Sequence, residues 1–315
     1  MQRFSTQPAM FDDGDVRLSG DLILPPENRP RAAIVLVHGS GPMGRDGGGY
    51  FVPHREHFAA NGYAVLSYDK PGVGESTGDW TRQSFEDRAR ETRAALRFLE
   101  SVPELRGVPH GLWGVSQAGW IMPMVADQVD FLIVVSGAVI VSHEQEAFRI
   151  SAMMEADGFT KPVIDDALQV YNRRVQMIRD GHSLVEVHRT EQASAAPSWA
   201  GYLGCETIDV LQFFAENVDF DPLPHWRAVT CPVLAIWGER DLYVPVDASL
   251  SRLQSALSAA GNVDWQYKTF ANANHGIGQV QTGTSTEKFS TFSDGYFDLI
   301  TDWLHTRHTP PEANS

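Results

Sequence analysis

The sequence predicts an α/β protein with a mostly parallel, doubly wound sheet and an inserted helical cap. Short, continuous apolar runs bounded by Gly, Pro or Asp recur along the chain, and segments with helical spacing separate them. Apolar runs of this length are typical of strands that are buried on both faces, and their alternation with helices predicts a parallel sheet. The long interval from Val141 to Cys231 contains no such run, which indicates an insertion.

The expected strands follow in chain order. An antiparallel edge strand is predicted over residues 15–24, which flank Gly20 with apolar side chains and end before two prolines. The buried central strands are expected at residues 32–37, 63–68, 111–115, 131–136 and 233–237. A further strand is expected over residues 264–270, in the last part of the chain.

Helices are predicted between these strands and within the insertion. Those of the core are expected at residues 84–100, 116–126, 247–260 and 293–306. The insertion has helical spacing at residues 162–179 and 208–216 and is rich in apolar and aromatic side chains, so we interpret it as a folded cap. An extra helical layer remote from any site is the alternative. The expected division is a core of residues 1–140 and 231–308, a cap of residues 141–230, and a tail of residues 309–315.

Charge and targeting signals narrow the class of partners. Lys and Arg number 25 and Asp and Glu number 40, which gives a net charge of −15. Such a surface disfavours nucleic acids and anionic membranes as partners. The polar start of the chain lacks the basic and apolar regions of a signal peptide, and the apolar stretch 131–135 is too short to cross a bilayer. We therefore expect a cytoplasmic protein that acts on a small molecule.

No metal and no other cofactor is expected. The two cysteines, Cys205 and Cys231, cannot form a disulfide framework or a cysteine-based zinc site. His54 and His57 are three residues apart, a spacing that matches no zinc-protease helix motif, and we predict that they lie at the solvated start of a helix.

The strongest chemical signal is Gly-Val-Ser-Gln-Ala-Gly at residues 114–119, between a predicted strand and a predicted helix. A nucleophile elbow needs this context, because a sharp strand-to-helix turn exposes the serine and small neighbours prevent clashes. Ser116 is therefore the candidate nucleophile. The alternative is an ordinary helix N-cap serine.

A Gly-rich turn, His-Gly-Ser-Gly-Pro at residues 38–42, follows the first buried strand. Acyl transfer creates a negative oxygen that preorganised N–H groups stabilise, and backbone amides in such a turn can provide them. We expect the amides of Gln117 and Ser40 to form this oxyanion hole. His38 is interpreted as structural.

Two further candidates lie after the last predicted strands. A serine nucleophile needs a histidine base, and the base needs a carboxylate that holds its tautomer. Asp241 and His275 follow successive strands, and the chain order Ser116, Asp241, His275 is the order Ser, Asp, His of one known triad arrangement. Glu239 is the nearest competitor for the acid.

Together with these motifs, Arg45-Asp46 and the block Tyr-Asp-Lys-Pro-Gly-Val-Gly-Glu-Ser at residues 68–76 make the chain resemble the α/β-hydrolases. More narrowly, it is similar to bacterial serine esterases of the prolyl-oligopeptidase and dienelactone-hydrolase branches. The resemblance covers residues 15–141 and 231–305, and it implies an α/β-hydrolase fold and a serine hydrolase. Ala118, and Pro71 where Arg is frequent, depart from the family pattern without affecting the catalytic roles.

We therefore predict a carboxylesterase-like enzyme that cleaves an ester of a moderately hydrophobic small molecule through an acyl-enzyme. A thioesterase, an amidase or peptidase, and a C–C bond hydrolase with the same triad remain open, and a non-catalytic binding protein is disfavoured by the complete triad. The insertion emerges at the edge of the sheet where the triad residues lie, so it is expected to roof an apolar pocket. The residues expected to line this pocket are Met153, Met154, Trp199, Tyr202 and Phe213.

Overall fold

The computed structural model describes residues 4–26, 29–196, 198–280, 284 and 291–308. Within this part of the chain, eight strands form one sheet in the order β1-β2-β4-β3-β5-β6-β7-β8. The strands are β1 (Ser5–Asp13), β2 (Val16–Leu24), β3 (Ala33–Val37), β4 (Ala64–Tyr68), β5 (His110–Val115), β6 (Phe131–Val135), β7 (Val233–Gly238) and β8 (Trp265–Phe270). Strands β3 to β8 are parallel, whereas β1 and β2 pair antiparallel with their neighbours. The mostly parallel α/β architecture predicted from the sequence is therefore confirmed.

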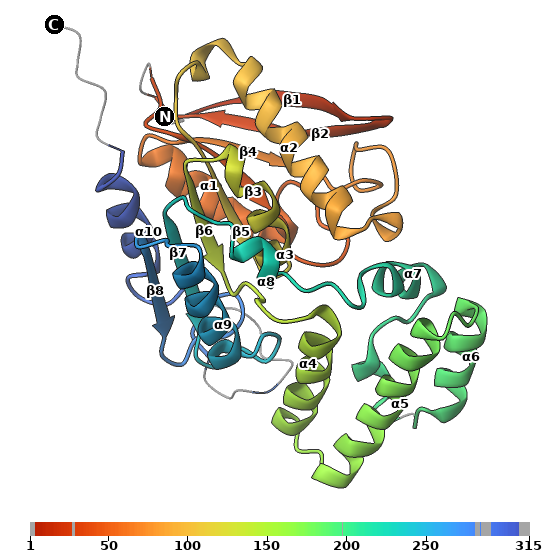
Figure 1. Cartoon of the computed structure of the whole chain (residues 1–315). Helices are drawn as coiled ribbons and strands as arrows, with labels where there is room; N and C mark the ends of the chain where they lie inside the picture. The colour runs from red at the N-terminus through yellow and green to blue at the C-terminus, as the bar shows by residue number, and fades with distance from the viewer. Residues whose placement is uncertain (1–3, 27–28, 197, 281–283, 285–290, 309–315) are drawn as a thin grey trace, which may run out of the picture.

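Helices cover both faces of this sheet (Figure 1). Helices α1 (Phe51–Ala60) and α10 (Tyr296–His305) pack on one face, where their aromatic side chains join the buried residues of the strands. The other face is covered by α2 (Phe85–Ser101), α3 (Ala118–Ile121), α8 (Leu223–Trp226) and α9 (Val246–Ala259). The central strands are almost entirely apolar because both of their faces are buried.

Between β6 and β7 lie α4 (Ser142–Ala156), α5 (Lys161–Arg179), α6 (Leu184–Ser194) and α7 (Ile208–Asn217), which project from one edge of the sheet (Figure 1). These helices share a small apolar core of their own, which includes Ile150 and Tyr171. Helices α4 and α6 had no counterpart in the sequence analysis. The division of the chain into core and cap stays a prediction, and the expected tail, 309–315, lies outside the described residues.

The N-terminal region corrects two expectations. Residues 15–24 do form a strand, but β2 lies between β1 and β4 and is therefore not at the edge of the sheet. The edge strand at this end of the sheet is β1, which the sequence analysis missed because most of its side chains are exposed and only alternate residues near its end are buried.

His54 also departs from expectation. It lies in α1 but is fully buried rather than solvated, since aromatic rings of α10 and the sheet surround it. Helix α1 faces the sheet at this point, which the polar residues His54-Arg55-Glu56-His57 did not reveal. Across the described ranges, no helix combines the length and the apolar character needed to cross a membrane.

Candidate active site

Ser116 occupies a sharp turn between the end of β5 and the start of α3. Its φ is 59°, in the left-handed region that few side chains adopt. Its backbone N–H donates to the Val135 carbonyl at 2.9 Å, which ties the turn to the neighbouring strand β6. A serine held in a strained strand-to-helix turn beside a pocket has the geometry of a nucleophile elbow.

Small residues on both sides make this turn possible. A Cβ on Gly114 would lie 2.5 Å from the Ala118 Cβ and 2.6 Å from the Met122 sulfur. A Cβ on Gly119 would lie 2.8 Å from the Gly137 Cα. All three distances are shorter than a side-chain Cβ tolerates, so these two positions require glycine. Ala118 is fully buried with its methyl group accommodated, which explains why alanine stands where the common motif has glycine.

Asp241 and His275, in the loops after β7 and β8, form a hydrogen-bonded pair. His275 Nδ1 lies 2.8 Å from Oδ2 and 2.9 Å from Oδ1 of the buried Asp241 carboxylate. Asp241 Oδ1 also accepts the backbone N–H groups of Tyr243 and Val244, at 2.8 and 3.0 Å. Because the carboxylate holds the proton on Nδ1, Nε2 is the ring nitrogen that can take up a further proton.

Glu239, the competing carboxylate, points elsewhere. It is exposed, and its Oε2 accepts the backbone N–H of Asn272 at 3.2 Å. Among the described side chains, the carboxylate that is hydrogen-bonded to the His275 ring is that of Asp241. The geometry therefore supports Asp241 as the acid partner.

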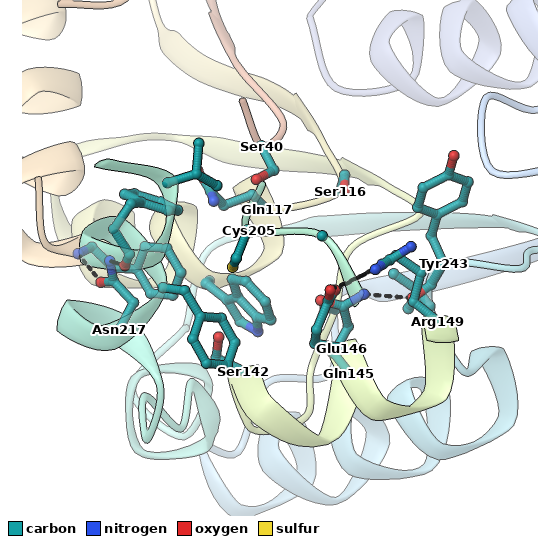
Figure 2. A pocket seen from close by; sticks show the side chains of 18 residues that line it. Ser40, Ser116, Gln117, Ser142, Gln145, Glu146, Arg149, Cys205, Asn217 and Tyr243 are labelled. Atoms are coloured by element: carbon teal, nitrogen blue, oxygen red, sulfur yellow. Dashed lines mark hydrogen bonds and ion pairs between the residues drawn. The ribbon is translucent and has the colours of Figure 1, made fainter. Parts of the chain in front are cut away.

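The turn after β3 lies beside Ser116. A Cβ on Gly39 would lie 3.4 Å from the Ser116 Cβ, an ordinary van der Waals contact. Ser40 and Gln117 line the same pocket as Ser116, and Figure 2 shows the three residues close together. The two amides expected to form an oxyanion hole thus belong to residues that border the pocket of the serine.

Buried residues brace this turn from behind. Asp69 accepts the backbone N–H and the Nη2 of Arg45, each at 2.7 Å. His38 is fully buried between the rings of Phe51 and Tyr68, and this burial holds its pKa well below the usual value. An uncharged, enclosed imidazole supports the structural role that we assigned to His38.

The pocket beside Ser116 has a volume of about 340 Å³ and is bounded by both the core and the insertion. Its apolar wall consists of Phe85, Trp120, Val210, Phe213 and Phe214. Cys205 also borders the pocket, but burial raises the pKa of this thiol to about 11. A thiol that stays protonated at neutral pH is a poor nucleophile, so Cys205 does not compete with Ser116.

Of the five residues that the sequence analysis expected around the pocket, Phe213 is among the lining residues. The other four are placed differently, as part of the insertion's own packing. Met154 and Trp199 are buried in its apolar core, Tyr202 packs against that core, and the sulfur of Met153 accepts a hydrogen bond from Arg149 Nη1 at 3.2 Å. A short helical bundle must fill its own interior first, which accounts for these apolar side chains.

Helix α4 supplies pocket residues that the sequence analysis missed. Ser142, Gln145, Glu146 and Arg149 line the pocket, and Figure 2 shows the last three near Tyr243. Arg149 and Glu146 form a bidentate ion pair, with Nη2–Oε1 at 2.6 Å and Nε–Oε2 at 2.8 Å. The spacing of these four polar residues follows one face of a helix, and this pattern was the available signal.

Comparisons with known proteins relate this chain to several hydrolases. Human mitochondrial acyl-coenzyme A thioesterase 2 is 26% identical over 170 residues, which are 53% of this chain and 31% of the thioesterase. The 2-hydroxy-6-oxononadienedioate/2-hydroxy-6-oxononatrienedioate hydrolase of Klebsiella pneumoniae is 24% identical over 236 residues, 71% of this chain and 75% of that enzyme. The chain thus spans less than a third of the human relative.

Solved structures agree on the fold. An esterase from Pyrococcus furiosus superposes with a TM-score of 0.64 at 15% identity, over 97% of this chain and 92% of the esterase.

Among the described residues, no cluster of three or more His, Cys, Asp or Glu side chains could hold a metal ion.

A family model described as "Alpha/beta hydrolase family" matches residues 34–281, which run from β3 past His275 and include the elbow and both of the later loops. This match spans most of the chain, and the order of the strands and the placement of the loops agree with it. The chain therefore belongs to the alpha/beta hydrolase family.

Proposed function

We propose that this protein is a hydrolase that cleaves carboxylic esters of moderately hydrophobic small molecules, with Ser116 as nucleophile, His275 as base and Asp241 as the supporting acid. One observation carries the proposal. The strained serine and the hydrogen-bonded Asp241–His275 pair follow parallel strands of one sheet, so all three lie at the same edge. Tyr243, which stacks on His275 at 4.8 Å between ring centroids, lines the same pocket as Ser116.

The proposed reaction has two halves. Ser116 Oγ attacks the ester carbonyl carbon while His275 Nε2 takes the hydroxyl proton, and Asp241 stabilises the resulting imidazolium. The imidazolium returns that proton to the departing alcohol oxygen, which leaves an acyl group on Ser116. Water, deprotonated by His275, then attacks the acyl carbon. The imidazolium returns this proton to Ser116 Oγ as the bond between Oγ and the acyl carbon breaks, which releases the acid and the free serine. In both halves, the backbone amides of Ser40 and Gln117 stabilise the negative oxygen.

The pocket favours an uncharged, largely apolar substrate. Aromatic side chains form one wall, and Arg149 is the single cation among the described residues that line it. The Arg149 guanidinium is already paired with the Glu146 carboxylate through two hydrogen bonds. An anionic substrate group would have to compete with Glu146, so neutral acyl and alcohol groups fit better.

A thioesterase is the second candidate, because the match with the human acyl-coenzyme A thioesterase supports thioester cleavage by this chain as well. A C–C bond hydrolase is supported in the same way by the Klebsiella pneumoniae relative, although the paired state of Arg149 disfavours substrates with carboxylates. Cleavage of amide or peptide bonds is supported by the triad alone, because the same triad can cleave these bonds.

A substrate panel tests the choice. The purified protein is assayed with p-nitrophenyl esters of increasing acyl length, an acyl-coenzyme A, an aminoacyl-anilide and a vinylogous 1,5-diketone. We expect the highest kcat/KM on an uncharged ester of intermediate length. A higher kcat/KM on acyl-coenzyme A would make the protein a thioesterase, and no turnover of any substrate would favour a binding protein.

Ser116→Ala tests the nucleophile directly. The variant should lose turnover while it keeps the wild-type circular dichroism spectrum. A fluorophosphonate should label wild-type protein on the peptide that contains Ser116 and should not label the variant. Retained activity in Ser116→Ala would exclude the serine mechanism.

A further inference from the structure

Lys70 is a fully buried lysine outside the proposed triad. It follows β4, and its Nζ donates to the carbonyl oxygens of Gly39 at 2.6 Å and Gly41 at 2.7 Å. Lysine is almost never fully buried unless it is paired, and here its partners are two backbone carbonyls of the turn that carries Ser40. The bonds therefore act on the proposed oxyanion turn itself.

Through the peptide unit between Gly39 and Ser40, these hydrogen bonds set the direction of the Ser40 N–H. A trans peptide is planar, and its C=O and N–H point to opposite sides. Since Lys70 holds the Gly39 oxygen on its own side, the Ser40 N–H is directed away from Lys70. Ser40 borders the pocket, whereas Lys70 is not among the described residues that line it.

The second carbonyl serves as an anchor. Gly41 precedes Pro42, which has no N–H, so fixing the Gly41 oxygen orients no further donor. It does hold the far end of the turn, and two attachment points restrict its rotation more than one.

The other proposed donor is supported in a similar way. Arg88, on α2 and buried, donates from Nη1 to the side-chain Oε1 of Gln117 at 2.8 Å. Arg88 is itself paired with Glu91, with Nε and Oε2 3.4 Å apart. One buried basic side chain thus donates to the carbonyls on either side of Ser40, and another donates to the side chain of Gln117.

We propose that Lys70 is a positioning residue of the oxyanion hole, which holds the Ser40 N–H toward the place where the negative oxygen forms. This inference rests on the proposed serine mechanism. Lys70 acts through Ser40 and does not contact the substrate.

The proposed role depends on where the N–H bonds of the Lys70 amine point, more than on the positive charge of that amine. Burial, together with the positive charge of Arg88, holds the pKa of Lys70 well below its usual value. An uncharged amine still has two N–H groups, one for each carbonyl. The arrangement therefore persists when the charge is lost.

The test compares p-nitrophenyl butyrate with the matching thionoester, in which sulfur replaces the carbonyl oxygen. Sulfur is larger and a weaker hydrogen-bond acceptor, so the oxyanion hole should favour the oxygen ester. In Lys70→Met, kcat on the ester should fall about 10- to 100-fold while KM changes less than about threefold, and the thionoester rate should fall much less. Lys161→Met, an exposed lysine on α5, is the matched control and should change neither rate.

An unchanged ester rate in Lys70→Met, or an equal fall on both substrates, would overturn the proposal, since a merely structural role affects both alike. If Lys70→Met does not fold, Lys70→Gln, whose side chain is one bond shorter and therefore draws the N–H donors away from the two carbonyl oxygens, provides the test through the same ratio of the two rates. An unchanged ratio in a folded Lys70→Gln then overturns the proposal. Ser116→Ala is assayed in parallel: activity in that variant would refute the serine mechanism and this inference together, whereas inactivity with normal Lys70 variants would refute this inference alone.

Discussion

Gly238 lies directly against the backbone of Asn274: a Cβ on Gly238 would be 2.3 Å from the Asn274 carbonyl oxygen. Gly238 ends β7 just before the loop of Asp241, and Asn274 immediately precedes His275. Two loops from different strands can approach this closely because the first lacks a side chain at the contact. The contact brings the carboxylate and the imidazole within hydrogen-bond distance.

Gly238→Ala should therefore disturb both stability and catalysis. The clash is with backbone atoms, which cannot turn aside as a side chain can, so we expect the free energy of unfolding to fall by about 1–3 kcal/mol. We also expect kcat to fall more than KM rises, because the Asp241–His275 pair is displaced. Urea unfolding and ester kinetics measure the two effects. Gly201→Ala, where a Cβ meets open space, is the control and should leave both near wild type.

Substitution of the two competing carboxylates should separate their roles. His275→Ala should lower kcat by several orders of magnitude, and Asp241→Asn by somewhat less, because the amide disturbs the tautomer and the charge support without removing the base. Glu239→Gln, on the same loop, should change kcat less than about twofold, since an exposed side chain bonded to a backbone N–H leaves the imidazole untouched. A silent Asp241→Asn together with a damaging Glu239→Gln would reverse the acid assignment.

Phe213→Ala should change the choice of substrate more than the chemistry. Phe213 lines the apolar wall of the pocket, so its truncation should raise kcat/KM for longer or bulkier acyl esters and leave kcat on the acetate near wild type. Met154→Ala is the matched variant within the insertion, because Met154 is buried but does not border the pocket. It should cost about 2–5 kcal/mol of stability without moving the chain-length optimum. If Met154→Ala changes the preferred acyl chain length and Phe213→Ala does not, the pocket has been assigned to the wrong residues.

His54 should make stability depend on pH. It is fully buried on α1, with Nδ1 2.8 Å from the Tyr50 carbonyl oxygen and Nε2 3.0 Å from the Tyr296 hydroxyl. Burial lowers the pKa of His54 from 6.5 to about 3. Below pH 6.5 the His54 side chain therefore binds a proton in the unfolded chain but stays neutral in the folded protein. Its contribution to stability is present above pH 6.5 and is lost as the pH falls toward 3, at up to about 1.4 kcal/mol per pH unit.

Urea unfolding of wild-type protein and His54→Phe between pH 7 and pH 4 measures this contribution. The loss of the Tyr296 partner should lower the stability of the variant by an amount that does not depend on pH. Its decline toward acid pH should be shallower than that of the wild type. Parallel curves for the two proteins would show that His54 carries no such linkage.

Much of the fold was predictable because a parallel sheet buries both faces of its central strands. Such strands are mostly apolar, so the expected boundaries of β3 to β7 agree with the structure within a residue or so. Strand β1 was missed because an edge strand with one exposed face keeps polar side chains. Helix α4 was missed for a similar reason, as its polar residues face a pocket rather than an apolar core.

The place where the catalytic loops meet follows from the sequence alone. Parallel strands end at one edge of their sheet, so motifs that follow successive strands must meet there, whatever lies between them in the chain. This rule brings Ser116, Ser40, Asp241 and His275 to one edge from segments more than two hundred residues apart.

The surroundings of that edge, in contrast, became known from the folded structure. Local sequence carries no sign that Lys70 is buried against Gly39, or that Met154 fills the insertion while Phe213 borders the pocket. The physical reason is that burial and pairing are properties of two segments in contact. The residues of one segment determine its periodicity, whereas the residue that covers each side chain comes from elsewhere in the chain.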